Sequence, residues 1–124
     1  MKNIILPINP TYSKKIINKT KLFEYRTRMP STKIKYIYIY ATKPICKIIA
    51  KVEVIELISF TPNELWKITK NESGITKEYF DNYFKGKNIA HAYRLGNIHK
   101  FLKPKNLKEF GINFIPQSFV YTDY

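Results

Sequence analysis

Three helix starts separate runs of alternating residues, and this order limits the folds that the chain can adopt. Asn9-Pro10 places an N-cap asparagine before a proline at the first helical position. Thr61-Pro62-Asn63-Glu64 has the pattern of a capping box, again with proline at the first helical position. Thr76 can cap a further helix that ends before Gly86. The sequence therefore predicts three helices at separated places in the chain.

Strands are predicted between and after these helices from alternation and β-branched content. Within residues 35–42, Ile37, Ile39 and Ala41 alternate with a row of tyrosines. Similar arguments predict strands over residues 3–8, 22–28, 47–58, 88–98 and 114–121, the last interrupted by Pro116, with one helical turn at 107–110. Five or six strands in a mixed order predict an α+β fold, a small mixed β-barrel surrounded by helices.

Length and composition fit one domain spanning residues 1–124. The apolar fraction of 44% and the aromatic fraction of 15% are too high for a disordered chain. Cys46 is the only cysteine, which excludes an internal disulfide and favours a reducing, cytoplasmic location. The apolar run Ile4-Ile5-Leu6 ends at Pro7 and is too short for a signal peptide or membrane span. No membrane partner is expected, and a monomer is favoured.

Basic residues are concentrated in the first 51 positions. This stretch holds twelve Lys/Arg and a single acidic residue, Glu24, and so carries +11 of the formal net charge of +13. Codon bias can raise the lysine content, but it does not explain why acidic residues return after position 51. A basic field of this kind predicts a phosphate-bearing partner, RNA or a nucleotide. The basic residues are expected to gather on one face around Glu24.

Several kinds of chemistry lack support in the sequence. The four glycines are scattered, so no phosphate-binding glycine-rich loop is present. His91 and His99 are eight residues apart and have no carboxylate at metal-ligand spacing. Neither a metal nor a cofactor is predicted.

The segment Lys21–Arg28 gives the strongest indication of a site. Alternation places Glu24, Arg26 and Arg28 on one face of a strand, with Lys21 at the turn before it. One interpretation is a polar cleft in which Lys21 and Arg26 hold phosphate or a base edge and Glu24 accepts a base N–H. The other is a solvated strand face with ion pairs of ~0–1 kcal/mol each. Spacing alone leaves both open.

Two further segments contribute candidate ligand-binding residues. Tyr36, Tyr38 and Tyr40 form a row that is either a stacking platform for unpaired bases or a covered aromatic face. For Tyr36 and Tyr38, a covered aromatic face is the favoured interpretation. The remaining candidates lie at the end of this strand and in the tail after Pro116: Tyr40, Thr42, Lys43, Gln117 and Ser118.

The segment Lys21-…-Glu24-Tyr25-Arg26 resembles the G-x-K-x-x-E-x-R motif of ASCH (activating signal cointegrator homology) domains, in the PUA-like superfamily. Three other segments agree in the same order along the chain: Leu6-Pro7-Ile8, Ile39-…-Pro44 and Pro116-…-Phe119. One position departs from the motif, because Lys19 stands where the family has glycine. The turn before Lys21 is therefore expected to be looser, or the helix longer.

The resemblance implies a β-barrel with a cleft lined by the Lys, Glu and Arg of the motif, and an RNA-binding role in translation or RNA modification. Some small members resemble amidohydrolases that act on N4-acetylcytidine. These use a Lys, a Thr and a helical Glu, where this chain has Lys21, Glu24 and, loosely, Glu72. Other relatives are nucleases.

Two classes of function therefore stand side by side. In the favoured interpretation the chain is an RNA- or nucleotide-binding module. The alternative is a small enzyme, a hydrolase of a modified nucleoside or a ribonuclease, in which Lys21, Glu24 and Glu72 are the candidate catalytic residues.

Overall fold

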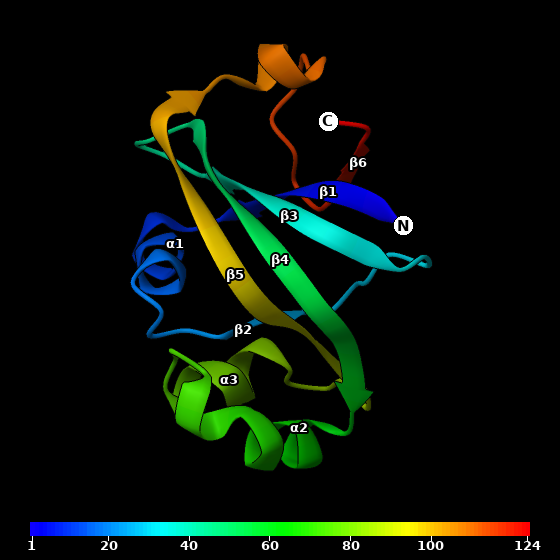
Figure 1. Cartoon of the computed structure of the whole chain (residues 1–124). Helices are drawn as coiled ribbons and strands as arrows, with labels where there is room; N and C mark the ends of the chain where they lie inside the picture. The colour runs from blue at the N-terminus through cyan, green and yellow to red at the C-terminus, as the bar shows by residue number, and fades with distance from the viewer.

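The computed structural model describes the whole chain, Met1 to Tyr124, and its framework is one six-stranded mixed sheet with helices packed on it (Figure 1). The elements in chain order are β1 (Lys2–Ile8), α1 (Pro10–Ile17), β2 (Phe23–Arg26), β3 (Ile34–Ala41), β4 (Lys47–Phe60), α2 (Pro62–Thr69), the 3-10 turn η1 (Lys70–Glu72), α3 (Lys77–Tyr83), β5 (Ala90–Lys105), the 3-10 turn η2 (Leu107–Phe110) and β6 (Val120–Thr122).

The strand order is β2-β5-β4-β3-β1-β6, and only β1 and β3 run parallel. The α+β prediction is confirmed, but the predicted barrel is not, because the sheet does not close. Strand β2 has four residues and pairs only with β5, while β6 has three residues and pairs only with β1. These two short strands are therefore the open edges of the sheet.

The helix starts lie where the sequence predicts them. The Asn9 side chain accepts a hydrogen bond from the Thr11 amide at 2.8 Å. Thr61 and Glu64 form the predicted capping box, and the Thr76 hydroxyl accepts from the Tyr79 amide at 3.1 Å. None of the helices is long and apolar enough to cross a membrane.

The strand boundaries differ most toward the C-terminus. Strand β5 continues to Lys105, well beyond the predicted end at residue 98, because it stays paired with the long β4 as far as Ile48. The predicted strand over residues 114–121 is reduced to Val120–Thr122. Pro116 has no amide hydrogen to offer a neighbouring strand, which agrees with its place before this short strand.

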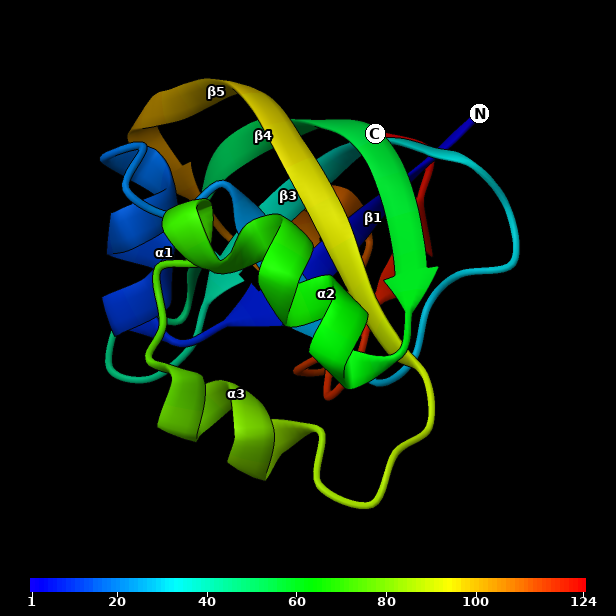
Figure 2. The same ribbon diagram turned by 90° about the horizontal axis from the view of Figure 1, so that it is seen from below.

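Three apolar clusters hold the fold together. The largest lies on one side of the sheet and includes Ile16 of α1 and Tyr93 of β5. A second packs Phe23 and Tyr25 of β2 against α2 and α3, whose arrangement is visible in Figure 2. The third contains Tyr38, Tyr40 and Phe110. Strand β2 thus has helices α2 and α3 on one side and the large cluster on the other. This packing on both sides fixes the positions of the polar side chains of β2.

Candidate functional site

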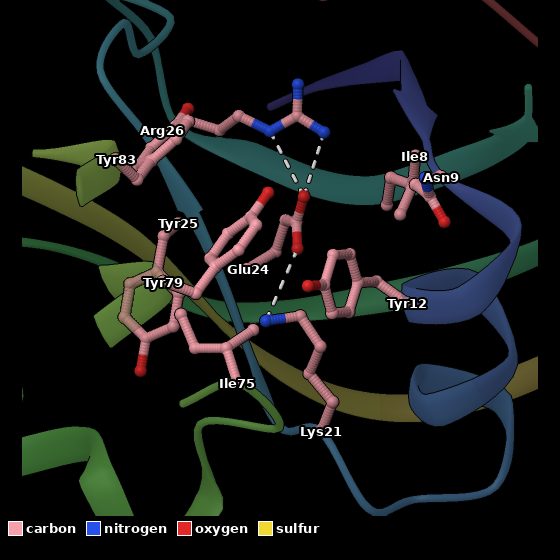
Figure 3. Close-up of a pocket in the computed structure, with 10 residues that line it drawn as sticks. All are labelled: Ile8, Asn9, Tyr12, Lys21, Glu24, Tyr25, Arg26, Ile75, Tyr79 and Tyr83. Carbon is pink, nitrogen blue, oxygen red and sulfur yellow. Dashed lines mark hydrogen bonds and ion pairs between the residues drawn. The ribbon is translucent and has the colours of Figure 1, made fainter. Parts of the chain in front are cut away.

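A pocket of about 190 Å³ opens where α1, β2 and α3 meet (Figure 3). Its walls come from the β1–α1 junction, from β2 with the residue Lys21 before it, and from the start and body of α3. The lining residues are Ile8, Asn9, Tyr12, Lys21, Glu24, Tyr25, Arg26, Ile75, Tyr79 and Tyr83.

Lys21, Glu24 and Arg26 form one connected charged group in this pocket, as drawn in Figure 3. The Lys21 Nζ lies 3.6 Å from Glu24 Oε1. Arg26 donates to Glu24 Oε2 from both Nε, at 3.1 Å, and Nη2, at 2.8 Å. The Glu24 side chain is only 9% exposed, so the alternative of a solvated strand face with ordinary surface ion pairs is wrong.

One arm of the Arg26 guanidinium stays available to a ligand. Nη2 is fixed by Glu24 and by the Pro7 carbonyl, to which it donates at 2.6 Å. The hydrogen bonds of this side chain come from Nε and Nη2 only. Nη1 makes none, and in Figure 3 it points away from Glu24. The guanidinium is therefore held rigidly on one side while two N–H donors face outward, an arrangement suited to an oxyanion.

Lys21 is the most deeply buried cation, at 1% exposure. Its ammonium donates to the Ser73 carbonyl at 2.9 Å and lies 4.8 Å from the centre of the Tyr25 ring. Burial lowers the pKa of Lys21 below its usual value, and the attraction of Glu24 offsets this effect only in part. Lys21 therefore serves first to hold Glu24 in place, because its ammonium is bonded to the Ser73 carbonyl and paired with Glu24.

The local backbone explains how Lys21 reaches this position. Helix α1 ends at Ile17, and Lys19 then adopts a left-handed conformation with φ of 63°. The expected looser turn or longer helix is not found: Lys19 takes the conformation that the family glycine would adopt without strain. The chain next runs beside residues 72–75, where Leu22 donates its amide to the Glu72 carbonyl and Lys15 Nζ donates to the Gly74 carbonyl.

Three tyrosines at the pocket were not predicted from the sequence. Tyr12 belongs to α1, and Tyr79 and Tyr83 belong to α3. The Tyr79 and Tyr83 rings are stacked, with centroids 6.4 Å apart and planes 8° apart, and they are 45% and 36% exposed. Their spacing of four residues on a helix is the signal that could have revealed this pair. They offer an exposed aromatic surface in the pocket that Arg26 also lines.

The other predicted site residues lie outside the pocket. Tyr40 is 2% exposed and packs in the cluster with Phe110, so it is a core residue. Glu72 is exposed and contributes its backbone carbonyl rather than its carboxylate. Arg28 is exposed beyond the end of β2. The remaining four follow β3 or precede β6, and none of them lines the pocket: Thr42, Lys43, Gln117 and Ser118.

The basic residues of the first 51 positions are also less concentrated than predicted. Lys21 and Arg26 do line the pocket, and Lys15 lies over the ring of Tyr12, another residue of its lining. Others make their contacts elsewhere: Lys2 lies over Tyr121, Lys47 reaches Asn106, and Lys51 lies over Tyr36. The prediction that this charge gathers around Glu24 is therefore wrong as stated. No group of three or more His, Cys, Asp and Glu side chains is placed to hold a metal ion.

Comparison with known proteins agrees with this architecture. The family described as "Domain of unknown function (DUF365)" matches residues 1–117. The crystal structure of ASCH from Zymomonas mobilis superposes with a TM-score of 0.89 at 29% identity, covering 97% of this chain and 87% of that one. The chain belongs to this ASCH-type family.

Other ASCH-type comparisons add detail. A Tyr-to-Phe variant of the Zymomonas protein also superposes with a TM-score of 0.89, at 28% identity over 98% of this chain and 90% of that one. The curated relative from Zymomonas mobilis is named ASCH domain-containing ribonuclease. It is 29% identical over 119 residues, covering 93% of this chain and 80% of that protein.

The chain also matches part of a much longer protein. It is 25% identical over 120 residues to the ATP synthase subunit alpha of Ureaplasma parvum. That match covers 95% of this chain but only 15% of the longer protein.

Proposed function

We propose that this ASCH-type protein binds RNA by holding one unpaired nucleotide at the pocket between α1, β2 and α3. The observation that carries the proposal is that one pocket is lined both by Arg26, whose Nη1 makes no hydrogen bond, and by the exposed, stacked rings of Tyr79 and Tyr83. Arginine is suited to phosphate oxygens, and tyrosine rings stack with any base. The two chemical groups of a nucleotide thus each meet a matching surface.

The size and charge of the pocket limit what enters it. At about 190 Å³ it is smaller than the ~300–1,000 Å³ of sites that enclose drug-sized ligands. It can take one base or one phosphate group, while the rest of the strand lies outside. Lys21, Glu24 and Arg26 together carry a net charge of +1, which favours an anionic ligand.

Binding by mutants tests this proposal. Arg26→Ala should weaken binding of a fluorescein-labelled ten-nucleotide oligouridylate by about tenfold or more, because a hydrogen bond to a charged group contributes ~1.5–3 kcal/mol. Arg28→Ala is the matched control, since Arg28 is exposed two residues later and does not line the pocket. Fluorescence anisotropy at several salt concentrations measures both. Equal losses for the two variants would contradict the proposal.

A second candidate function is cleavage of the bound RNA, and the name of the Zymomonas relative favours it. In such a reaction the ribose 2′-oxygen attacks the adjacent phosphorus, the bond from phosphorus to the 5′-oxygen breaks, and a 2′,3′-cyclic phosphate and a 5′-hydroxyl result. A base must take the 2′-hydroxyl proton, an acid must supply a proton to the 5′-oxygen, and a cation must stabilise the phosphorane. Glu24 is the candidate base, Arg26 is the candidate cation, and a solvent water supplies the proton to the leaving 5′-oxygen.

Product analysis separates binding from cleavage. Cleavage predicts cyclic-phosphate products from the oligouridylate, lost in Glu24→Gln and retained in Arg28→Ala. If the oligonucleotide binds tightly but stays intact, only the binding function is supported.

Deacetylation of N4-acetylcytidine has no support from the pocket. Glu24 stands in place of the threonine and is paired with Arg26, and the Glu72 side chain lies outside the pocket. A cytoplasmic location, a monomeric state and a single unit over residues 1–124 stay predictions.

A further inference from the structure

A second surface lies on the side of the sheet opposite the pocket. Lys51 of β4 and His99 of β5 are direct partners across the two strands. Val52 and Ile98, next to them in the sequence, are also partners and pack with the large apolar cluster. Because successive side chains of a strand point to opposite sides, Lys51 and His99 face away from that cluster.

The pocket is on the cluster side. Glu24 is paired across β2 and β5 with Tyr93, a fully buried member of the large cluster. One nucleotide cannot touch both surfaces. Figure 1 shows the middle parts of β3, β4 and β5 with no helix in front of them, since α2 and α3 lie at one end of the molecule and η2 at the other.

A hollow of about 380 Å³ occupies this uncovered region. The Tyr36 ring and the methylene chain of Lys51 provide apolar walls, and the side chains of Asn97 and His99 provide hydrogen-bonding groups at the rim. Of the tyrosine row, the sequence predicts Tyr40 as the exposed member. The structure buries Tyr40 and leaves Tyr36 partly accessible. A planar group with polar edges, such as a nucleobase, matches these walls and this rim.

Cations and aromatic rings alternate across the same surface. The Lys51 Nζ lies 4.2 Å from the centre of the Tyr36 ring, and the Lys35 Nζ lies 5.4 Å from it. Farther along β5, His99 contacts the Phe101 ring edge to face at 5.5 Å, and Lys105 lies over the same ring at 5.4 Å. Three ammonium groups thus flank the hollow and its continuation, and such a combination of cations and aromatic rings suits single-stranded nucleic acid.

One carboxylate faces this region and has its own partner. Glu53 is opposite Tyr36 across β3 and β4, and its Oε1 accepts the Asn97 amide hydrogen at 3.1 Å. The hydrogen bond holds this negative charge at the edge of the hollow. The local balance of Lys35, Lys51 and Lys105 against Glu53 remains positive.

We propose that the surface formed by Lys35, Tyr36, Lys51, His99, Phe101 and Lys105 is a second binding surface for single-stranded RNA, separate from the pocket. The choice of RNA as the occupant rests on the proposed function. A strand long enough to pass around the edge of the sheet can occupy both surfaces, whereas a mononucleotide held at the pocket does not reach the second. The second surface therefore adds affinity for long strands and none for mononucleotides.

Charge reversal at Lys51 tests this proposal. Lys51→Glu should weaken binding of a labelled twenty-nucleotide oligouridylate by about tenfold at low salt and flatten the salt dependence by roughly 0.7 per lost phosphate contact. Uridine monophosphate should bind as in the wild type. Lys67→Glu is the matched control, because Lys67 is exposed on α2 and lines neither the pocket nor the hollow. Equal behaviour of the two variants would overturn the proposal.

Photocross-linking gives a readout that does not depend on the pocket. A 4-thiouridine oligonucleotide should cross-link to the peptides that contain Tyr36 or His99, as identified by mass spectrometry. Cross-links confined to other peptides, or displacement by poly-aspartate at equal charge concentration, would overturn the second surface. If Arg26→Ala leaves binding unchanged while Lys51→Glu lowers it, the pocket fails and the second surface stands. The reverse pattern supports the pocket alone.

Discussion

Gly74 and Lys21 are in direct contact, and the contact leaves no room for a side chain at position 74. A Cβ atom at Gly74 would lie 2.4 Å from the Lys21 Cβ and 2.6 Å from its Cγ. Gly74 also has φ of 69°, a conformation that favours glycine. The Lys21 stem thus lies against bare backbone, and its ammonium reaches Ser73 and Glu24 from there.

Gly74→Ala should therefore destabilise the protein by about 2–4 kcal/mol, the combined effect of overpacking and left-handed strain. Gly86→Ala is the matched control: Gly86 has φ of 77°, but a Cβ there meets nothing within 4 Å, so only the backbone strain of about 1 kcal/mol applies. Urea unfolding of both variants measures the difference. Equal losses would show that the Lys21 stem moves aside freely.

The stability of the protein should depend on pH through Lys21. The native pKa of Lys21 is lowered by burial, while the unfolded chain keeps the ordinary lysine value near ~10.4. Between these two values the unfolded state binds more protons, so the free energy of unfolding attributable to Lys21 rises with pH. The wild type should therefore gain stability relative to Lys21→Met as pH increases toward 10. The comparison cancels the buried tyrosines, which act in the opposite direction at higher pH. A constant difference across this range would contradict the lowered pKa.

Lys19 offers a stabilising substitution. Its φ of 63° costs an L-residue roughly 1 kcal/mol, which glycine avoids, although glycine also gains entropy in the unfolded chain. Lys19→Gly should raise the free energy of unfolding by about 0.5–1 kcal/mol and the Tm by a few degrees. Lys14→Gly, in the interior of α1, should instead lower it. Calorimetry of both variants checks the opposite signs.

Local signals explain most of what the sequence predicts correctly. The helix starts at Asn9, Thr61 and Thr76 depend on neighbouring residues only, and so does the alternation that brings Glu24 and Arg26 to one side of β2. Closure of the sheet is different, because it depends on pairing between edge strands that are far apart in the sequence.

The tyrosines of β3 and α3 also show that contacts between distant parts of the chain could not be predicted from local signals. Alternation correctly puts Tyr36, Tyr38 and Tyr40 on one side of β3, but it does not say that Phe110 packs with Tyr38 and Tyr40. The contribution of Tyr79 to the pocket likewise requires knowledge of where α3 packs. Motifs within one element could be predicted, whereas contacts between distant elements could not.

The exposed ring pair on α3 should contribute to nucleotide binding. Tyr79→Ala should weaken binding of uridine monophosphate by about fivefold or more, since stacking on an aromatic side chain contributes ~1–3 kcal/mol per base. Tyr121→Ala is a suitable control, because Tyr121 is similarly exposed at 39% but lies on β6 and does not line the pocket. Isothermal titration calorimetry gives both affinities. A larger loss for Tyr121→Ala would place the base elsewhere.

The central claim is that a nucleotide binds where Arg26 faces the tyrosines of α3, and a crystal structure with bound uridine monophosphate tests it most directly. The account predicts a phosphate oxygen within hydrogen-bond distance of Arg26 Nη1, the base against Tyr79 or Tyr83, and Glu24 still paired with Arg26. A nucleotide bound away from these side chains, with the pocket unchanged at saturating ligand, would contradict it.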